Sequence, residues 1–284
     1  MHIPPYENKN LPIVDVDDAS VPLAYFNIVK LSRGEEFVST VPGYETCLVP
    51  VQGSIDVTVE RKGVDSMSFN AVGERASVWE GEPSAVYVPV GFSARFICRS
   101  ESTEIFVAGA RFDQTFEPFA VRPADIDPVQ YGSDETKTHR KIKHILGQKP
   151  PGRVGRLLVS ELFTVGAGGW SGFPPHKHDN DRFPEETRHN EIYNFRFRPE
   201  HGFGMQLLQA EDAQVGHAYH VLNASTLKIE GGYHPCVAAP GYEMYYFTIL
   251  AGLSRRPLTQ YFHPVHAYQV ETIPGIKDMI AKFK

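Results

Sequence analysis

Short apolar runs, interrupted roughly every ten residues by glycine, proline or polar residues, dominate the chain. Runs such as TCLVPV, SIDVTVE, SAVYVPV, EIFVAGARF, RLLVSELFTV, EIYNFRF and MYYFTILAG alternate or are rich in β-branched and aromatic residues, which is typical of strands in a sandwich or barrel. Long helical periodicity is nearly absent. In the tail, Ile276, Met279, Ile280 and Phe283 could share one face of a short helix. The pattern predicts an all-β protein with a short C-terminal helix.

The two halves of the chain resemble each other in order. GYETCLVPVQGSIDV, SAVYVPVGFSARF and EIFVAGARF in the first half correspond to HNEIYNFRFRPEHGFGMQ, STLKIEGGYHPCV and YYFTILAGL in the second. Aligning residues 89–93 with 230–234 sets the register, and Glu45 is then matched with Glu191. The polar, punctuated stretch 123–152 differs in texture and indicates a boundary. We therefore predict an internal duplication with domains 1–135 and 136–284.

Composition narrows the classes of partner. The 284 residues can bury an ample core without disulfides or structural metal. With 28 basic and 34 acidic residues, the net charge of -6 offers no basic field for nucleic acid or a membrane surface. No targeting segment and no membrane-length apolar run is evident, and Cys47, Cys98 and Cys236 each lie among apolar residues. We expect a soluble, cytoplasmic protein with reduced cysteines in its core.

Candidate chemistry is confined to the second half. Only His2 precedes residue 139, and the other eleven histidines lie at or after it. In a strand, residues two apart point to the same face, so His176 and His178 can present two imidazoles to one point inside a barrel. Pro174 and Pro175 stiffen the approach to this pair. The H-x-H spacing alone is weak evidence for a metal site, because such a pair also arises by chance, and further ligands are needed.

Later strands offer the remaining ligands. Glu191 opens an alternating run whose same face carries Tyr193 and Phe195, and His234 follows a turn containing Gly231 and Gly232. Two histidines, a carboxylate and a third histidine suit one catalytic divalent ion such as zinc, manganese, iron or nickel. Other interpretations stay open: His176 and His178 could be surface histidines, His234 a core histidine, and Glu185 or Glu186 could replace Glu191.

Several motifs together resemble a known family. PPHKHD, then PEET, EIY with RF, GF with Q, and finally GYHPCVAAPGYEMYY are similar to the 5-deoxyglucuronate isomerases of myo-inositol breakdown, from about Gly43 to the last strands. The related 5-keto-4-deoxyuronate isomerases share the fold and the ligand set but lack the long insertion between His178 and Glu191. The resemblance implies two tandem cupin (jelly-roll) barrels, with a zinc-like ion held by His176, His178, Glu191 and His234. The N-terminal barrel is expected to bind no metal, because Ser93 takes the place of His234 and no H-x-H precedes Glu45.

The implied reaction converts the aldose 5-deoxy-D-glucuronate to the ketose 5-dehydro-2-deoxy-D-gluconate. A carboxylate of the insertion 179–190, Glu185 or Glu186, is the predicted general base if partial burial raises its pKa. The substrate carboxylate could be held by a basic side chain, and hydroxyls by polar groups at motif positions. The predicted substrate contacts are Arg188, Arg196, Lys177, Gln206 and Tyr246, each of which could instead be surface charge or packing.

Some residues depart from the family pattern near the expected mouth of the site. They are Tyr193-Asn194-Phe195, Arg188-His189-Asn190 and Phe262-His263-Pro264-Val265-His266. Two other functions therefore stay open: another metal-cupin enzyme on a sugar acid, such as a uronate ketol-isomerase or an iron dioxygenase, and a non-catalytic carbohydrate-binding cupin. In each case the partner is a small sugar acid, and exposed strand edges make a homo-oligomer the default expectation.

Overall fold

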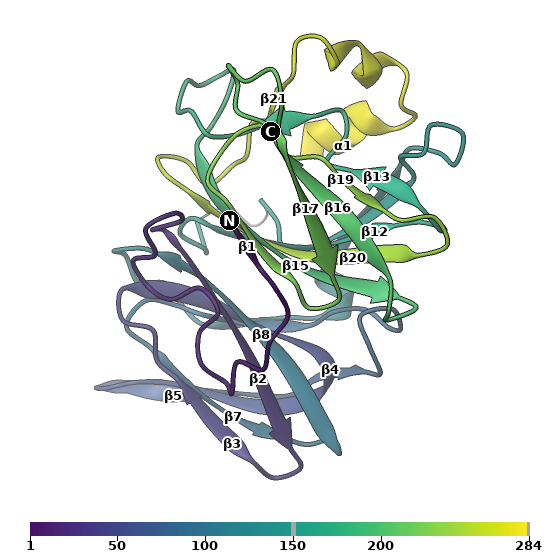
Figure 1. Ribbon diagram of the computed structural model, residues 1–284. Coiled ribbons are helices and arrows are strands. Elements are labelled where there is room, and N and C mark those ends of the chain that lie inside the picture. The colour runs from purple at the N-terminus through teal and green to yellow at the C-terminus, as the bar shows by residue number, and fades with distance from the viewer. Residues whose placement is uncertain (149–151, 283–284) are drawn as a thin grey trace.

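Two β barrels stack on each other in the computed structural model, which describes residues 1–148 and 152–282 (Figure 1). The predicted all-β fold is confirmed, and helix α1 (Ile276–Lys282) is the short helix expected in the tail. Ile276 and Met279 are buried on its inner face, whereas Phe283 lies outside the described residues. Among the described residues, no helix is long and apolar enough to cross a membrane.

The first barrel is built from β2 to β9. Its larger sheet has the order β2-β8-β4-β6-β9; β4 also pairs with β5 and β7, and β3 pairs with β7. The interior between these strands is filled by apolar side chains such as Val29, Leu48 and Phe96. The bounds are β2 (Ala24–Ser32), β3 (Glu36–Ser39), β4 (Tyr44–Arg61), β5 (Val64–Arg75), β6 (Ala85–Val88), β7 (Ser93–Cys98), β8 (Ser102–Arg111) and β9 (Phe119–Val121).

The second barrel contains a sheet of order β1-β18-β15-β20-β12-β11-β10, a sheet β13-β19-β16-β17 and the pair β14-β21. The chain changes barrel between Val121 and Asp127, through the short 3-10 turn η1 (Pro123–Asp125), ahead of the predicted boundary at 135–136. Strand β1, at the start of the chain, also belongs to this barrel, where it pairs with β18. The bounds are β1 (His2–Ile3), β10 (Asp127–Tyr131), β11 (Arg140–Leu146), β12 (Leu157–Thr164), β13 (Gly169–Ser171), β14 (His176–Lys177), β15 (His189–Arg198), β16 (Phe203–Leu208), β17 (His217–Leu222), β18 (Thr226–Ile229), β19 (Cys236–Ala238), β20 (Glu243–Gly252), β21 (Tyr261–Phe262) and the 3-10 helix η2 (Ala267–Glu271).

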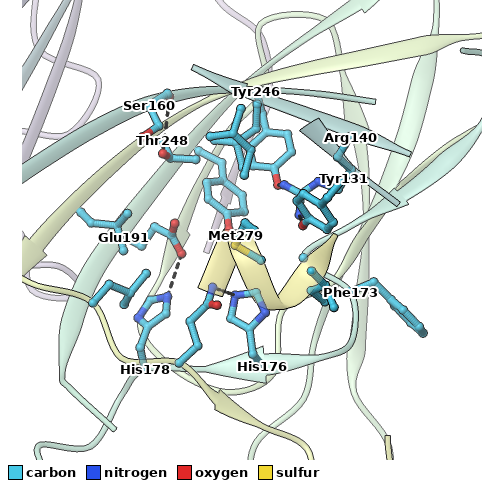
Figure 2. Close-up of a pocket in the computed structure, with 18 of the residues that line it drawn as sticks. Tyr131, Arg140, Ser160, Phe173, His176, His178, Glu191, Tyr246, Thr248 and Met279 are labelled. Carbon is cyan, nitrogen blue, oxygen red and sulfur yellow. Dashed lines mark hydrogen bonds and ion pairs between the residues drawn. The ribbon is translucent and has the colours of Figure 1, made fainter. Parts of the chain in front are cut away.

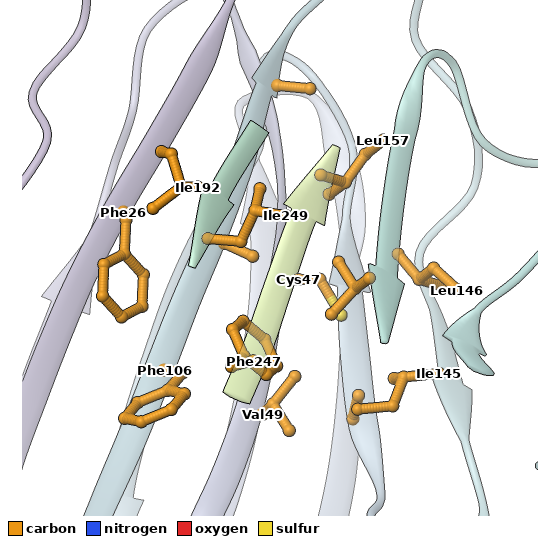
Figure 3. Close-up of a cluster of buried hydrophobic side chains, with 14 of the residues drawn as sticks. Phe26, Cys47, Val49, Phe106, Ile145, Leu146, Leu157, Ile192, Phe247 and Ile249 are labelled. Atoms are coloured by element: carbon orange, nitrogen blue, oxygen red, sulfur yellow. The ribbon is translucent and has the colours of Figure 1, made fainter. Parts of the chain in front are cut away.

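One face of each large sheet packs against the other barrel. Phe26, Val49 and Phe106 of the first barrel share one buried apolar cluster with Ile192 and Phe247 of the second (Figure 3). Phe106 meets Phe247 edge-on, with ring centroids 5.1 Å apart. Burial of this apolar cluster stabilises the contact between the two barrels. The predicted core cysteines are also confirmed: all three are free and buried.

The duplication is visible in the register of strand pairing. This register also shows that the expected match of Glu45 with Glu191 is wrong. Thr46 pairs with Val88 as Glu191 pairs with Ile229, and Val88 precedes Ser93 by the same interval as Ile229 precedes His234. The residue equivalent to Glu191 is therefore Thr46, and Glu45 is equivalent to Asn190. Because a slip of one residue exchanges the faces of a strand, Glu45 points out of its barrel.

Glu45 and Asn190 fasten the barrels to each other. The Glu45 carboxylate accepts hydrogen bonds from the backbone N–H groups of Gly155, Arg156 and Leu157 at 2.8, 2.7 and 2.9 Å. The Asn190 side-chain oxygen accepts one from the backbone N–H of Leu23, at 3.0 Å. Equivalent positions of the two repeats thus hold the backbone that leads into β12 and β2.

A buried ion pair also crosses the interface. Arg75 of β5 donates two hydrogen bonds to Glu161 of β12, at 3.1 and 2.6 Å, and Tyr245 donates a third at 3.0 Å. The side chains of Arg75 and Glu161 are 1% and 0% exposed. Removing one partner leaves the other charge buried without compensation, which is far more costly than losing a surface pair.

We therefore expect Arg75→Met to lower the free energy of unfolding by about 3 to 5 kcal/mol, measured by urea denaturation. Lys30→Met, which breaks the exposed pair of Lys30 with Glu7, is the control and should change stability by less than about 1 kcal/mol. The double variant Arg75→Met with Glu161→Leu should recover part of the loss. Equal effects of Arg75→Met and Lys30→Met would contradict this account.

Candidate metal centre

Three predicted ligands meet inside the second barrel. His178 follows β14, Glu191 is in β15, and His234 lies between β18 and β19; all three are buried. Their ligand atoms lie within 4.8 Å of one another, with Nε2 of His178 3.0 Å and Nε2 of His234 3.4 Å from the same Glu191 oxygen. The sequence signals from two strands and one turn therefore converge on one point.

A tight glycine turn positions His234. Gly232 has φ +85°, and a Cβ there would lie 2.5 Å from the carbonyl oxygen of Gln209, so only glycine fits this close approach. The Gly232 carbonyl accepts a hydrogen bond from Nδ1 of His234 at 2.7 Å, and its N–H donates to Asp179 at 2.6 Å. The turn thus orients the ring and ties it to the start of the insertion.

The protonation of His234 fits a metal ligand. A carbonyl oxygen can only accept, so Nδ1 of His234 carries the hydrogen, and burial lowers the pKa of this histidine to about 4. Nε2 then presents a bare lone pair to a carboxylate oxygen of Glu191, and within the described residues it has no hydrogen-bond partner. Two lone-pair atoms facing each other in a buried site call for a cation between them. The residues present therefore fit a divalent ion.

The two other histidines differ in their surroundings. Burial lowers the pKa of His178, but its hydrogen bond to Glu191 and the charge of that carboxylate outweigh this and raise the pKa overall. His176 lies beside His234, with ring centroids 4.9 Å apart, but is not part of the three-residue cluster. Its Nε2 faces the amide nitrogen of Gln260 at 2.9 Å. The role of His176 as the fourth ligand stays a prediction.

A cavity opens in front of these histidines. His178 and Glu191 lie on one side, while Arg140, Tyr131 and Tyr246 are grouped on the other (Figure 2). Further polar groups in the lining are Ser160, Tyr193, Thr248 and Gln260; apolar ones are Ile142, Leu162, Phe173, Leu250, Leu258, Phe262, Ile276 and Met279. Such a mixture of apolar walls and a few convergent polar groups is typical of a small-molecule site.

Of the predicted substrate contacts, Tyr246 lines the cavity. Gln206 is buried behind His234 and donates to its carbonyl oxygen at 2.7 Å. Arg196 forms an ion pair with Glu104 of the first barrel, and Arg188 is exposed. Lys177 points away from the cavity into a cluster of carboxylates. The structure thus brings one of these five side chains into the cavity.

The predicted general bases lie outside the cavity lining. Glu186 is fully buried and accepts hydrogen bonds from Lys177, from Arg182 and from the backbone N–H groups of Asp179 and Asn180. These contacts favour a structural role in which Glu186 stabilises the insertion. Glu185 lines a neighbouring hollow that shares Leu258, Gln260 and Phe262 with the cavity. The role of either carboxylate as a base stays a prediction.

Several cavity residues were missed from the sequence. Tyr131 and Arg140 come from the stretch interpreted as a linker, and Gln260 comes from the tail. Arg140 opens the short apolar-alternating run RKIKHIL, which is a strand signal hidden among polar residues. The alternation of this run is the one feature that could have indicated a second-barrel strand.

Comparison with known proteins agrees with this architecture. A family model described as KduI/IolB matches residues 2–269. The chain belongs to the KduI/IolB family. Relatives in this family include the 5-deoxy-glucuronate isomerase of Lacticaseibacillus casei, 30% identical over 264 residues that cover 91% of this chain and 93% of the relative. The protein of the same name from Geobacillus kaustophilus is 30% identical over 270 residues, which cover 93% of both.

Solved structures extend the comparison. An IolB-like protein from Salmonella typhimurium LT2 is 27% identical, covers 94% of both chains and has a TM-score of 0.80. An oxalate decarboxylase of Bacillus subtilis is 11% identical, with a TM-score of 0.57 over 81% of this chain and 68% of that one, and it shows the fold alone. The prediction of two tandem cupin barrels is thus confirmed for this KduI/IolB family member.

We expect His234→Ala and Glu191→Ala to abolish stoichiometric binding of zinc or manganese, because each removes one of three converging ligands. Metal content after dialysis, measured by inductively coupled plasma mass spectrometry, checks this. His201→Ala, at an exposed site, is the control and should retain the metal. Full retention by both site variants would exclude this cluster as the metal centre.

The insertion gives a separate prediction. Glu186→Gln replaces an acceptor of several buried donors with an amide that also donates, so the free energy of unfolding should fall by about 2 to 3 kcal/mol. Glu185→Gln, at the exposed neighbouring residue, should stay within about 0.5 kcal/mol of the parent. Urea denaturation measures both. An unchanged stability of Glu186→Gln would show that the insertion does not depend on this carboxylate.

Proposed function

We propose that this protein is a 5-deoxyglucuronate isomerase, which converts 5-deoxy-D-glucuronate to 5-dehydro-2-deoxy-D-gluconate. The observation that carries the proposal is similarity along nearly the whole chain to proteins named 5-deoxy-glucuronate isomerase. The cavity supports it independently, since it places histidines and a carboxylate opposite a group of hydroxyls and a guanidinium. A polar six-carbon acid needs both kinds of contact.

The reaction moves hydrogens within one molecule. The C2 hydrogen leaves as a proton, a C1–H bond forms, and the hydroxyl hydrogen passes from O2 to O1, so that no external oxidant or reductant is required. A divalent ion bound by His178, Glu191 and His234, with His176 as the predicted fourth ligand, would supply Lewis-acid stabilisation of the negative charge that develops on the oxygens. We propose zinc as this ion.

The chain's own groups have separable tasks in this proposal. Tyr193, Tyr246, Ser160 and Thr248 offer hydroxyls for hydrogen bonds to the sugar, and burial keeps the pKa of both tyrosines well above the usual value, so both are neutral. Ile276 and Met279 of α1, with Leu258, cover the cavity with apolar surface. Excluding water strengthens polar contacts inside and protects a reactive intermediate.

The wider setting is proposed on the same basis. We place the reaction in myo-inositol breakdown in the cytoplasm, with the protein acting as a homo-oligomer on a small sugar acid. The acidic net charge of -6 favours neither nucleic acid nor a membrane surface as a partner. The proton carrier is proposed to be Glu185 or Glu186, which requires the insertion to bring one of them toward the cavity.

Proton NMR of 5-deoxy-D-glucuronate in heavy water tests the function. The metal-loaded protein should produce the ketose, chelator-treated protein should lose at least about two orders of magnitude in rate, and zinc or manganese should restore it. Glu185→Gln and Glu186→Gln, compared at equal folded fraction, locate the base. Absence of ketose with metal-loaded protein would reject the isomerase, and oxygen consumption would then indicate a dioxygenase.

A further inference from the structure

Arg140 places a buried guanidinium at the wall of the cavity. It is the first residue of β11 and is 3% exposed. It donates hydrogen bonds to the hydroxyls of Tyr131 and Tyr246 at 2.6 and 2.7 Å. Its Nε is buried and has no hydrogen-bond partner in the part of the chain that the structure describes. A charged side chain with one unpaired donor therefore lies in the wall of the cavity.

No anion of the described residues neutralises this charge. The groups that interact most strongly with it electrostatically are Tyr131, Tyr246, Cys236 and Tyr193, and His176, which is not an anion, interacts with it as well. Burial raises the pKa of all three tyrosines, and it raises the pKa of Cys236 to about 12, so these groups are uncharged at neutral pH. Glu191, the one carboxylate in the cavity lining, is directed to His178 and His234.

Two other arginines with little exposed side chain differ from Arg140 in having a carboxylate partner. Arg75 is equally buried but is matched by Glu161, and Arg196 is matched by Glu104. An isolated buried charge is costly unless something compensates it. A ligand that supplies an anion would compensate Arg140 each time it binds.

We propose that Arg140 is the specificity-determining residue that binds the carboxylate of the sugar acid. The inference rests on the proposed function and deepens it. The free Nε and the adjacent Nη2 form the edge of the guanidinium that matches two carboxylate oxygens. Tyr131 and Tyr246 hold the plane of this edge, as their hydroxyls accept from both terminal nitrogens.

The position also suits a substrate with two different ends. Arg140 lies on the wall of the cavity opposite His178 and Glu191 (Figure 2). An aldose acid carries its reactive C1 and C2 at one end and its carboxylate at the other. Binding of the acid at Arg140 therefore directs the reactive carbons toward the histidine cluster, which is positioning by remote binding energy.

The test compares an acid with a neutral partner of the same length. The first probe is the acid obtained by reducing the C1 aldehyde of 5-deoxy-D-glucuronate to an alcohol, so that no carbonyl remains to isomerise. The second probe is the same compound with a CH2OH group in place of the C6 carboxylate. In calorimetric titrations of the metal-loaded protein, Arg140→Met should weaken binding of the acid by about 10²-fold or more. It should change the affinity for the neutral alditol by less than about threefold. Arg140→Lys should be intermediate, because it keeps charge but loses the fork.

Turnover provides the second arm. Arg140→Met should lower kcat/KM for 5-deoxy-D-glucuronate by about 10² to 10³-fold. It should lower kcat/KM much less for the corresponding aldose that has a CH2OH group in place of the C6 carboxylate. Metal content must stay stoichiometric. Arg75→Met, which removes an equally buried guanidinium that is not part of the cavity lining, should lower stability without changing the preference for the acid over the neutral probe.

The outcomes separate the two proposals. Arg140-dependent binding of the acid without turnover by the parent protein would reject the isomerase and retain Arg140 as a carboxylate site. Turnover by the parent with equal losses for acid and neutral probes in Arg140→Met would retain the isomerase and overturn the role of Arg140. If Arg140→Met does not fold, Arg140→Lys replaces it: a reduced preference for the acid over the neutral probe supports the proposal, and an unchanged preference overturns it.

Discussion

The strict alternation of side chains in β12, β15 and β20 is the constraint on which both the fold and the site depend. On one face, Leu157, Val159, Ile192, Phe247 and Ile249 pack against the first barrel. On the other, Ser160, Leu162, Glu191, Tyr193, Tyr246 and Thr248 line the cavity. A slip of one residue in β15 would bury Glu191 in the apolar interface and send Ile192 into the cavity. Packing between the barrels therefore fixes the register that directs Glu191 toward the histidines.

The same alternation explains which features could be predicted from the sequence. The strands, His178, Glu191 and the glycine turn before His234 are encoded locally, by period-two patterns and by a backbone conformation that glycine adopts most readily. The alternation of RKIKHIL marks the strand that begins with Arg140, but the placement of Arg140 and Gln260 in the cavity is not encoded locally. They reach the cavity because β11 pairs with β12 and β21 pairs with β14, and such long-range pairings leave no signal in the neighbouring residues.

Closeness in sequence to the histidines did not predict which charged residues line the cavity. Parity, meaning an odd or even number of positions along a strand, is a better predictor because it determines which face a side chain occupies. Lys177 lies between His176 and His178, so a strand directs it to the opposite face, where it meets Glu186. Arg196 differs from Glu191 by an odd number of positions and faces Glu104 of the first barrel. Parity thus separates these two basic residues from the cavity, whereas Glu185 and Glu186 lie in a loop where parity has no meaning.

Glu45 does not correspond to Glu191, because the pairing register makes Thr46 the equivalent residue and places Glu45 on the opposite face of its strand. With the register corrected, Glu45 and Asn190 occupy equivalent outward positions, and each accepts hydrogen bonds from backbone of the other barrel. The inward neighbours differ: Thr46 in one barrel and Glu191 in the other. Inward and outward faces of a strand can change independently, because a substitution on one face does not alter contacts on the other. A duplicated barrel can therefore fill its interior with apolar side chains, as the first barrel does, and still hold in register the sheet that carries Glu191 in the second.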